Sequence, residues 1–116
     1  MSNRILIIDD DLMVLQTAKQ ILETSNYNCI AAEDSARAMT LMQKFHKSLR
    51  LIIVDAMMPG IDGASLLRKL RKVNPSIKAI GFSGAAPDVT KRLHEAGVIQ
   101  MLRKPVDPNV LKNIVE

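Results

Sequence analysis

The stretch Leu51-Ile52-Ile53-Val54-Asp55 places four consecutive apolar residues directly before a carboxylate. The apolar run is mostly β-branched and too short for a helix, so it predicts a strand that is buried on both faces. A second run of this kind, Ile5–Ile8, leads into the three aspartates Asp9–Asp11. Buried strands without an alternating polar face are typical of parallel sheets that helices cover on both sides.

Outside these two runs, short apolar segments alternate with segments whose apolar residues recur at helical spacing. We expect strands over residues 5–8, 29–32, 51–54, 77–82 and 98–102, and helices over residues 12–22, 38–45, 65–73, 88–96 and 108–115. A turn is expected over residues 58–63 and a loop over residues 83–87. Asp10 or Asp11 could cap the first helix, Asp34 or Ser35 the second, and Gly97 closes the fourth.

Five strand–helix repeats predict an α/β fold with a doubly wound, five-stranded parallel sheet. Right-handed crossovers favour the flavodoxin-like strand order 2-1-3-4-5. The 116 residues fit one compact domain, so residues 1–116 are expected to form a single unit. Ligands of such sheets bind beyond the carboxyl ends of the strands, here between the first and third strands. Function should therefore depend on the residues at those ends.

Composition narrows the classes of function. The single cysteine, Cys29, cannot form an internal disulfide, and its strand-like neighbours predict an inert core thiol.

The net charge of +4 suggests nucleic acid as a partner, but the basic residues are scattered and only 3% of residues are aromatic. The densest basic group, Arg68–Lys72, predicts a solvated helix face, so nucleic-acid binding is not expected. Without a signal-peptide core or a membrane span of about 20 apolar residues, we expect a cytoplasmic protein.

Chemically useful side chains follow four of the predicted strands: Asp9 and Asp10, Asp55, Ser83, and Lys104. Each alone has an ordinary explanation, such as a helix cap, a loop residue or a surface charge. Together the carboxylates would repel one another by roughly 4 kcal/mol per pair at about 4 Å and an effective dielectric near 20. A cation among them would remove this cost, and hard carboxylate oxygens select Mg²⁺ or Mn²⁺.

This set of groups suits phosphoryl transfer. The reaction needs in-line positioning and neutralisation of the charge on the phosphoryl oxygens. Mg²⁺, Lys104 and the Ser83 hydroxyl could each hold one oxygen, while Asp55 acts as nucleophile and forms an aspartyl phosphate. Gly84, which has no side chain, would leave the approach open.

The motifs resemble those of response-regulator receiver domains of two-component systems over nearly the whole chain. The matching segments are Ile5–Asp10, Ile52–Gly63, Gly81–Gly84 and Arg103–Pro105. The resemblance implies that a histidine kinase or phosphotransfer protein phosphorylates Asp55 in a Mg²⁺-dependent reaction. It further implies that the modified domain changes conformation to signal a downstream protein or an output domain, as one step of a phosphorelay.

The resemblance also assigns individual roles. Asp10, Asp55 and the backbone carbonyl of Met57 would bind the metal directly, and Asp9 would act through a metal-bound water. Ser83 and Lys104 match the hydroxyl and the lysine that sense the phosphoryl group, and Gly84 lies beside them. The remaining motif positions are structural: Pro59, Gly63 and Pro105. The resemblance also implies a cis peptide bond before Pro105.

One position departs from the family. The residue three before the lysine is often Tyr or Phe, but here it is Met101. A switch would then use repacking of Met101 or a backbone shift instead of an aromatic rotamer. The segment Phe82-Ser83-Gly84 resembles receivers at the ends of hybrid histidine kinases.

Two alternatives differ in kind from a phosphoacceptor switch. A degenerate receiver would serve only as a protein-binding module, although every site residue is present. A haloacid-dehalogenase-type phosphatase would also use a strand-end Asp, but it needs a second acid where this chain has Met57. We therefore expect a domain that catalyses only its own phosphorylation and dephosphorylation and is otherwise not an enzyme.

Overall fold

The structure is a computed structural model that describes residues 3–84 and 87–115. Five strands form one sheet in the order β2-β1-β3-β6-β7, and every pairing in it is parallel. Their bounds are β1 Arg4–Ile8, β2 Asn28–Ala32, β3 Leu49–Asp55, β6 Lys78–Ser83 and β7 Gln100–Arg103. In this sheet β6 and β7 are the fourth and fifth strands along the chain, so the predicted order 2-1-3-4-5 is confirmed.

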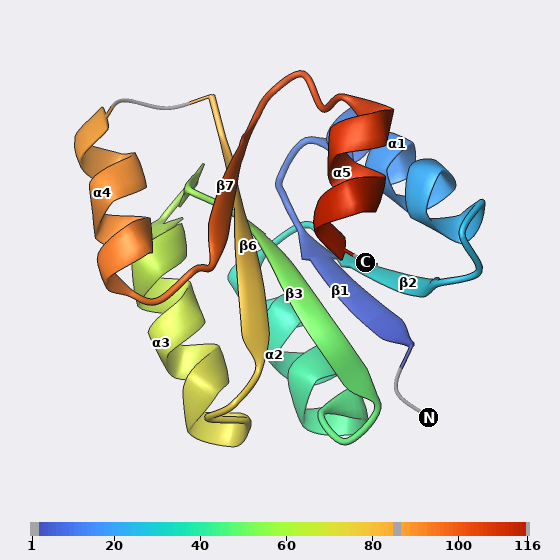
Figure 1. Cartoon of the computed structure of the whole chain (residues 1–116). Helices are drawn as coiled ribbons and strands as arrows, with labels where there is room; N and C mark the ends of the chain where they lie inside the picture. Colours follow the sequence, from blue (N-terminus) through green and yellow to red (C-terminus); the bar gives the residue numbers. More distant parts are fainter. Residues whose placement is uncertain (1–2, 85–86, 116) are drawn as a thin grey trace.

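Helices cover both faces of the sheet, as the apolar strands require (Figure 1). Their bounds are α1 Leu12–Glu23, α2 Ser35–Phe45, α3 Gly63–Val73, α4 Pro87–Glu95 and α5 Pro108–Val115. Ile5 and Ile7 of β1 pack in one core with α1 and α5, whereas Leu6 and Ile8 pack in a second core with α2, α3 and α4. All four side chains are fully buried, so this strand has no polar face.

The helix ends follow from local capping. Asp11 accepts from the backbone N–H groups of Met13 and Val14 and begins α1, and Asp34 caps α2 in the same way. Asp62 accepts from the Ser65 N–H, so α3 begins at Gly63, two residues earlier than predicted. Gly97 has a φ of +100°, which confirms its predicted place after the fourth helix.

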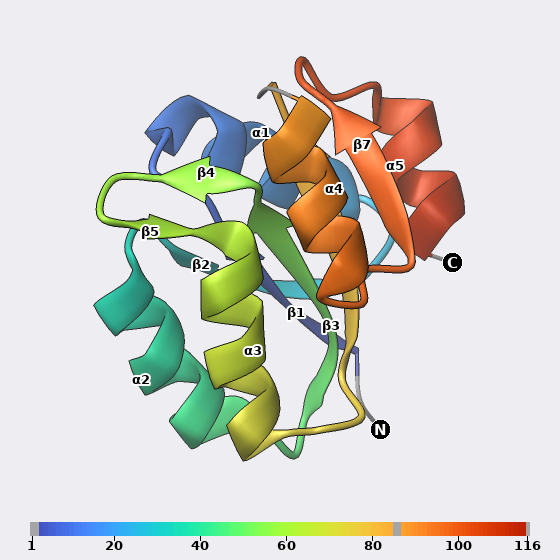
Figure 2. The ribbon, with the colours of Figure 1, turned by 90° about the vertical axis from the view of Figure 1, so that its left-hand side faces the viewer.

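A small antiparallel hairpin stands where a turn was predicted (Figure 2). It consists of β4, Met57–Met58, and β5, Ile61–Asp62, and Gly60 between them has a φ of +83°. Gly63 then brings α3 against the end of β3, because a Cβ at this position would overlap the carbonyl oxygen of Asp55. The hairpin and this close approach fix the direction of the chain as it leaves Asp55.

The basic group on α3 is only partly the solvated face that was predicted. Arg68, Lys69 and Lys72 are exposed, but Arg71 is half-buried. Its guanidinium donates to the carbonyl oxygens of Ala96 at 2.6 Å and of Gly97 and Ile77 at 3.1 Å. Arg71 therefore anchors the chain where α4 ends.

Two further expectations concern the core and the membrane. Cys29 is buried in the core, as predicted, and burial raises the pKa of its thiol to about 11, which disfavours the reactive thiolate. Among the described residues, no helix combines the length and the apolar character that crossing a membrane requires.

Candidate functional site

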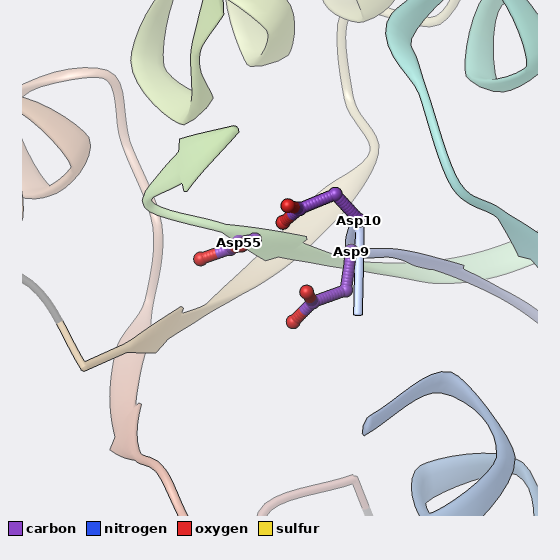
Figure 3. A group of neighbouring side chains, drawn as sticks. All are labelled: Asp9, Asp10 and Asp55. Atoms are coloured by element: carbon purple, nitrogen blue, oxygen red, sulfur yellow. The ribbon is translucent and has the colours of Figure 1, made fainter. Parts of the chain in front are cut away.

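Three carboxylates meet at the carboxyl end of the sheet (Figure 3). Asp9 and Asp10 follow β1, and Asp55 is the last residue of β3, which pairs with β1 up to Ile8 and Val54. One oxygen from each carboxylate lies within 4.8 Å of the others. Asp9 is fully buried and Asp55 is 4% exposed, whereas Asp10 faces solvent. The sheet therefore brings together the carboxylates that the sequence singled out.

Lys104 supplies the opposite charge and directly follows β7, the strand at one edge of the sheet. Its Nζ lies 2.7 Å from Oδ2 of Asp9 and 3.3 Å from Oδ2 of Asp55. The backbone brings it there, because the Lys104 N–H donates to the carbonyl oxygen of Ser83 as β7 ends beside β6. Burial alone would lower the pKa of Lys104, but the hydrogen bond to Asp9 and the charge of Asp55 raise it above its ordinary value.

Asp55 carries an electrostatic penalty despite this ion pair. Burial first and the charge of Asp9 second raise the pKa of Asp55 to about 6, although Lys104 and the Met57 N–H lower it in part. One ammonium cannot neutralise three carboxylates, and buried like charges attract a counter-ion. An oxygen-only donor set of this kind fits a hard divalent cation.

Ser83 ends β6, next to Asp55, but its hydroxyl has a partner on α4. Ser83 Oγ lies 2.9 Å from Oγ1 of Thr90. Gly84 lies against Lys104, since a Cβ at Gly84 would be 3.9 Å from that side chain. No motif indicated Thr90, because a threonine inside a helix is ordinary and the contact depends on the packing of α4.

Three other predicted positions are Met101, Pro59 and Pro105. Met101 of β7 stands opposite Gly81 of β6, and its thioether fills the space that a side chain at Gly81 would need. Pro59 lies in the turn of the β4–β5 hairpin. The peptide bond between Lys104 and Pro105 is cis, as expected.

Comparison with known proteins decides the family. Residues 5–116 match the family described as "Response regulator receiver domain". The chain belongs to this family. Solved receiver domains have the same fold: that of Methanospirillum hungatei is 31% identical, with a TM-score of 0.86 over 98% of this chain and 91% of that one. The receiver domain of the hybrid histidine kinase CckA is also 31% identical, with a TM-score of 0.81 over 97% and 94% of the two chains.

Curated relatives are longer proteins in which a receiver is one part. A cyclic di-GMP phosphodiesterase of Thermotoga maritima is 31% identical over 93% of this chain, which spans 28% of that protein. The sensor kinase CckA of Brucella abortus is 32% identical over 78% of this chain and 10% of its own length. Receiver domains are signalling domains of response regulators and sensor kinases, and the role of phosphoacceptor switch fits this one.

Proposed function

We propose that this receiver accepts a phosphoryl group on Asp55 from a phosphohistidine and changes conformation in response. The observation that carries the proposal is the buried Asp55 carboxylate, clustered with Asp9 and Asp10 and paired with Lys104. Its raised pKa reflects a position that disfavours an isolated charge, which is where a nucleophile or a metal ligand is expected.

Asp10, Asp55 and the backbone carbonyl of Met57 would hold Mg²⁺ or Mn²⁺ directly, with Asp9 contributing through a water. When bound, the metal neutralises charge on the phosphoryl group that is being transferred. Asp10 is the exposed member of the cluster, which leaves a side open to solvent and to a phosphoryl donor.

In the reaction, an oxygen of Asp55 attacks phosphorus while the bond from phosphorus to the donor histidine breaks, and the donor imidazole retains the electron pair. Lys104 is already within 3.3 Å of Asp55 and can pair with a phosphoryl oxygen. Ser83, on the neighbouring strand, would donate a hydrogen bond from its hydroxyl to another phosphoryl oxygen.

A histidine kinase or phosphotransfer protein is the donor we propose, acting in the cytoplasm where ATP supplies the phosphoryl group. A sensor kinase and a sensor protein among the relatives agree with this partner. Close in sequence to the aspartates of the cluster, Leu12, Met13 and Met57 are 58%, 73% and 51% exposed, and each offers apolar area on which a donor protein can pack. The downstream partner would be either an output domain in the same protein or another protein.

Intact-mass measurement tests the proposal. Acetyl phosphate or a phosphohistidine donor with Mg²⁺ should add about 80 Da, the mass of one phosphoryl group, to the wild type and nothing to Asp55→Asn. Glu33→Gln, which changes an exposed carboxylate outside the cluster, serves as the matched control and should be labelled like the wild type. Labelling of Asp55→Asn would contradict the assignment, and no labelling of the wild type would favour a degenerate binding module.

We further propose that the domain does not turn over other phosphate esters. A steady-state assay with a phosphomonoester should show no sustained release of phosphate. Sustained turnover that Asp55→Asn abolishes would instead identify a phosphatase.

A further inference from the structure

The hydroxyl of Ser83 connects the phosphoryl site to helix α4. Ser83 Oγ and Thr90 Oγ1 lie 2.9 Å apart, and the two residues belong to different elements, the end of β6 and the middle of α4. Both side chains are half-buried, so the bond is partly protected from competing water. This hydrogen bond joins α4 to a proposed phosphoryl-binding residue.

The single proton of Ser83 can serve only one acceptor at a time. A serine hydroxyl has one donor and two acceptor positions, and the oxygens of a phosphoryl dianion only accept. Either hydroxyl could be the donor in this 2.9 Å contact. Ser83 is assigned as the donor and Thr90 as the acceptor, since threonines within helices commonly donate their own proton to a carbonyl of the preceding turn. Thr90 and a phosphoryl group on Asp55 therefore compete for the same proton.

Other contacts of α4 determine which part of the helix responds. Arg71 holds the chain just after α4 through the carbonyl oxygens of Ala96 and Gly97. Nearer the middle, Arg92 pairs with Asp62 at 3.3 Å, but its side chain is half exposed, and exposed pairs contribute little. Loss of the bond to Thr90 would therefore remove one restraint on the amino-terminal half of α4, which Val89 still packs against the core, while the other end stays anchored.

The space needed for this movement is present. A cleft of about 560 Å³ lies between α4 and β7, and its lining includes Ser83, Thr90 and Met101. Met101 and Leu93 of α4 together fill the space above Gly81. A shift of α4 would therefore require Met101 to repack, which its unbranched side chain allows.

We propose that Thr90 is a positioning residue that holds the Ser83 hydroxyl against α4 in the unphosphorylated domain and releases it to the phosphoryl group. The inference rests on the proposed function, since it takes Asp55 as the phosphorylated residue and Ser83 as a phosphoryl ligand. Removing the Thr90 hydroxyl should then favour the phosphorylated conformation.

Titration with beryllofluoride, a mimic of the phosphoryl group, in the presence of Mg²⁺ measures the effect. Thr90→Val removes the hydroxyl and keeps the shape, and it should bind beryllofluoride about three- to tenfold more tightly than the wild type, the range expected for one net hydrogen bond. Thr90→Ser keeps the hydroxyl and should restore the wild-type affinity. Amide exchange near the start of α4 should be faster in Thr90→Val without beryllofluoride and equal to the wild type with it.

The Ser83→Ala background separates competition for the proton from packing. There, Thr90→Val should leave the affinity unchanged, because the contested proton is gone. Unchanged or weaker binding in Thr90→Val, or a gain that persists in Ser83→Ala, would overturn the role of Thr90. If Ser83→Ala alone binds like the wild type, the proposed role of Ser83 fails with it. Labelling of Asp55 by mass judges the proposed function independently.

Discussion

At the scale of single residues, Asp55 is held where its charge is unfavourable. Burial raises its pKa to about 6 from an ordinary value of 3.8, so the folded protein binds the carboxyl proton more readily than the unfolded chain does. The resulting contribution to the free energy of unfolding is present below about pH 4 and is lost as the pH rises through 6. Nucleophilic function thus opposes stability at neutral pH.

Asp55→Asn removes this penalty. In metal-free buffer at pH 8 it should raise the free energy of unfolding by about 1–3 kcal/mol, and the gain should disappear below about pH 4. Urea denaturation at several pH values measures the difference. Glu33→Gln is the control and should stay within about 0.5 kcal/mol of the wild type throughout. A gain that did not depend on pH would point to packing instead of ionisation.

At the scale of elements, Arg71 joins three of them. From α3 it donates to carbonyl oxygens at the end of α4 and just before β6. Arg71→Ala should lower the free energy of unfolding by about 1–3 kcal/mol, since hydrogen bonds from a charged donor are lost and partly buried carbonyls are left unpaired.

Urea denaturation with amide exchange checks this prediction. The exposed neighbour Lys72 provides the control, and Lys72→Ala should change stability by no more than about 0.5 kcal/mol. Faster exchange in Arg71→Ala should appear first at the end of α4. Equal stability of the two variants would show that the guanidinium contacts contribute nothing.

The elements also show which parts of the fold and of the site the sequence could predict. The apolar runs before Asp9 and Asp55 predicted β1 and β3, and with them the meeting of the carboxylates, because parallel strands end at one edge of the sheet. The β4–β5 hairpin was missed, since strands of two residues have no periodicity to detect. Arg71 and Thr90 were missed for another reason. Their partners lie on other elements, and only packing decides which residues of an amphipathic helix meet them.

At the scale of the whole molecule, metal binding should appear as stability. A cation that binds only the folded state stabilises it by about 2.7 kcal/mol at 100 times its dissociation constant. Mg²⁺ should therefore raise the unfolding temperature of the wild type, and EDTA should reverse the effect and prevent phosphorylation. Asp10→Asn should reduce the response more than Asp9→Asn does, because Asp10 is the proposed direct ligand.

Thermal denaturation with increasing Mg²⁺ measures these responses. Asp88→Asn, an exposed carboxylate on α4, should respond like the wild type. Equal Mg²⁺ responses of the wild type and Asp10→Asn would rule out Asp10 as a ligand.

The ion pairs of Lys104 influence which dissolved ions the acidic cluster should respond to. This ammonium is tethered to β7 and lies beside Asp9 and Asp55, so its local concentration far exceeds that of any free monovalent ion. Potassium or sodium would offer the cluster a single charge that Lys104 already supplies, and without the hydrogen bonds. A divalent ion adds a second positive charge, which the ammonium of Lys104 cannot supply. The domain should therefore be indifferent to the abundant monovalent salt of a cell and responsive to a much scarcer divalent ion.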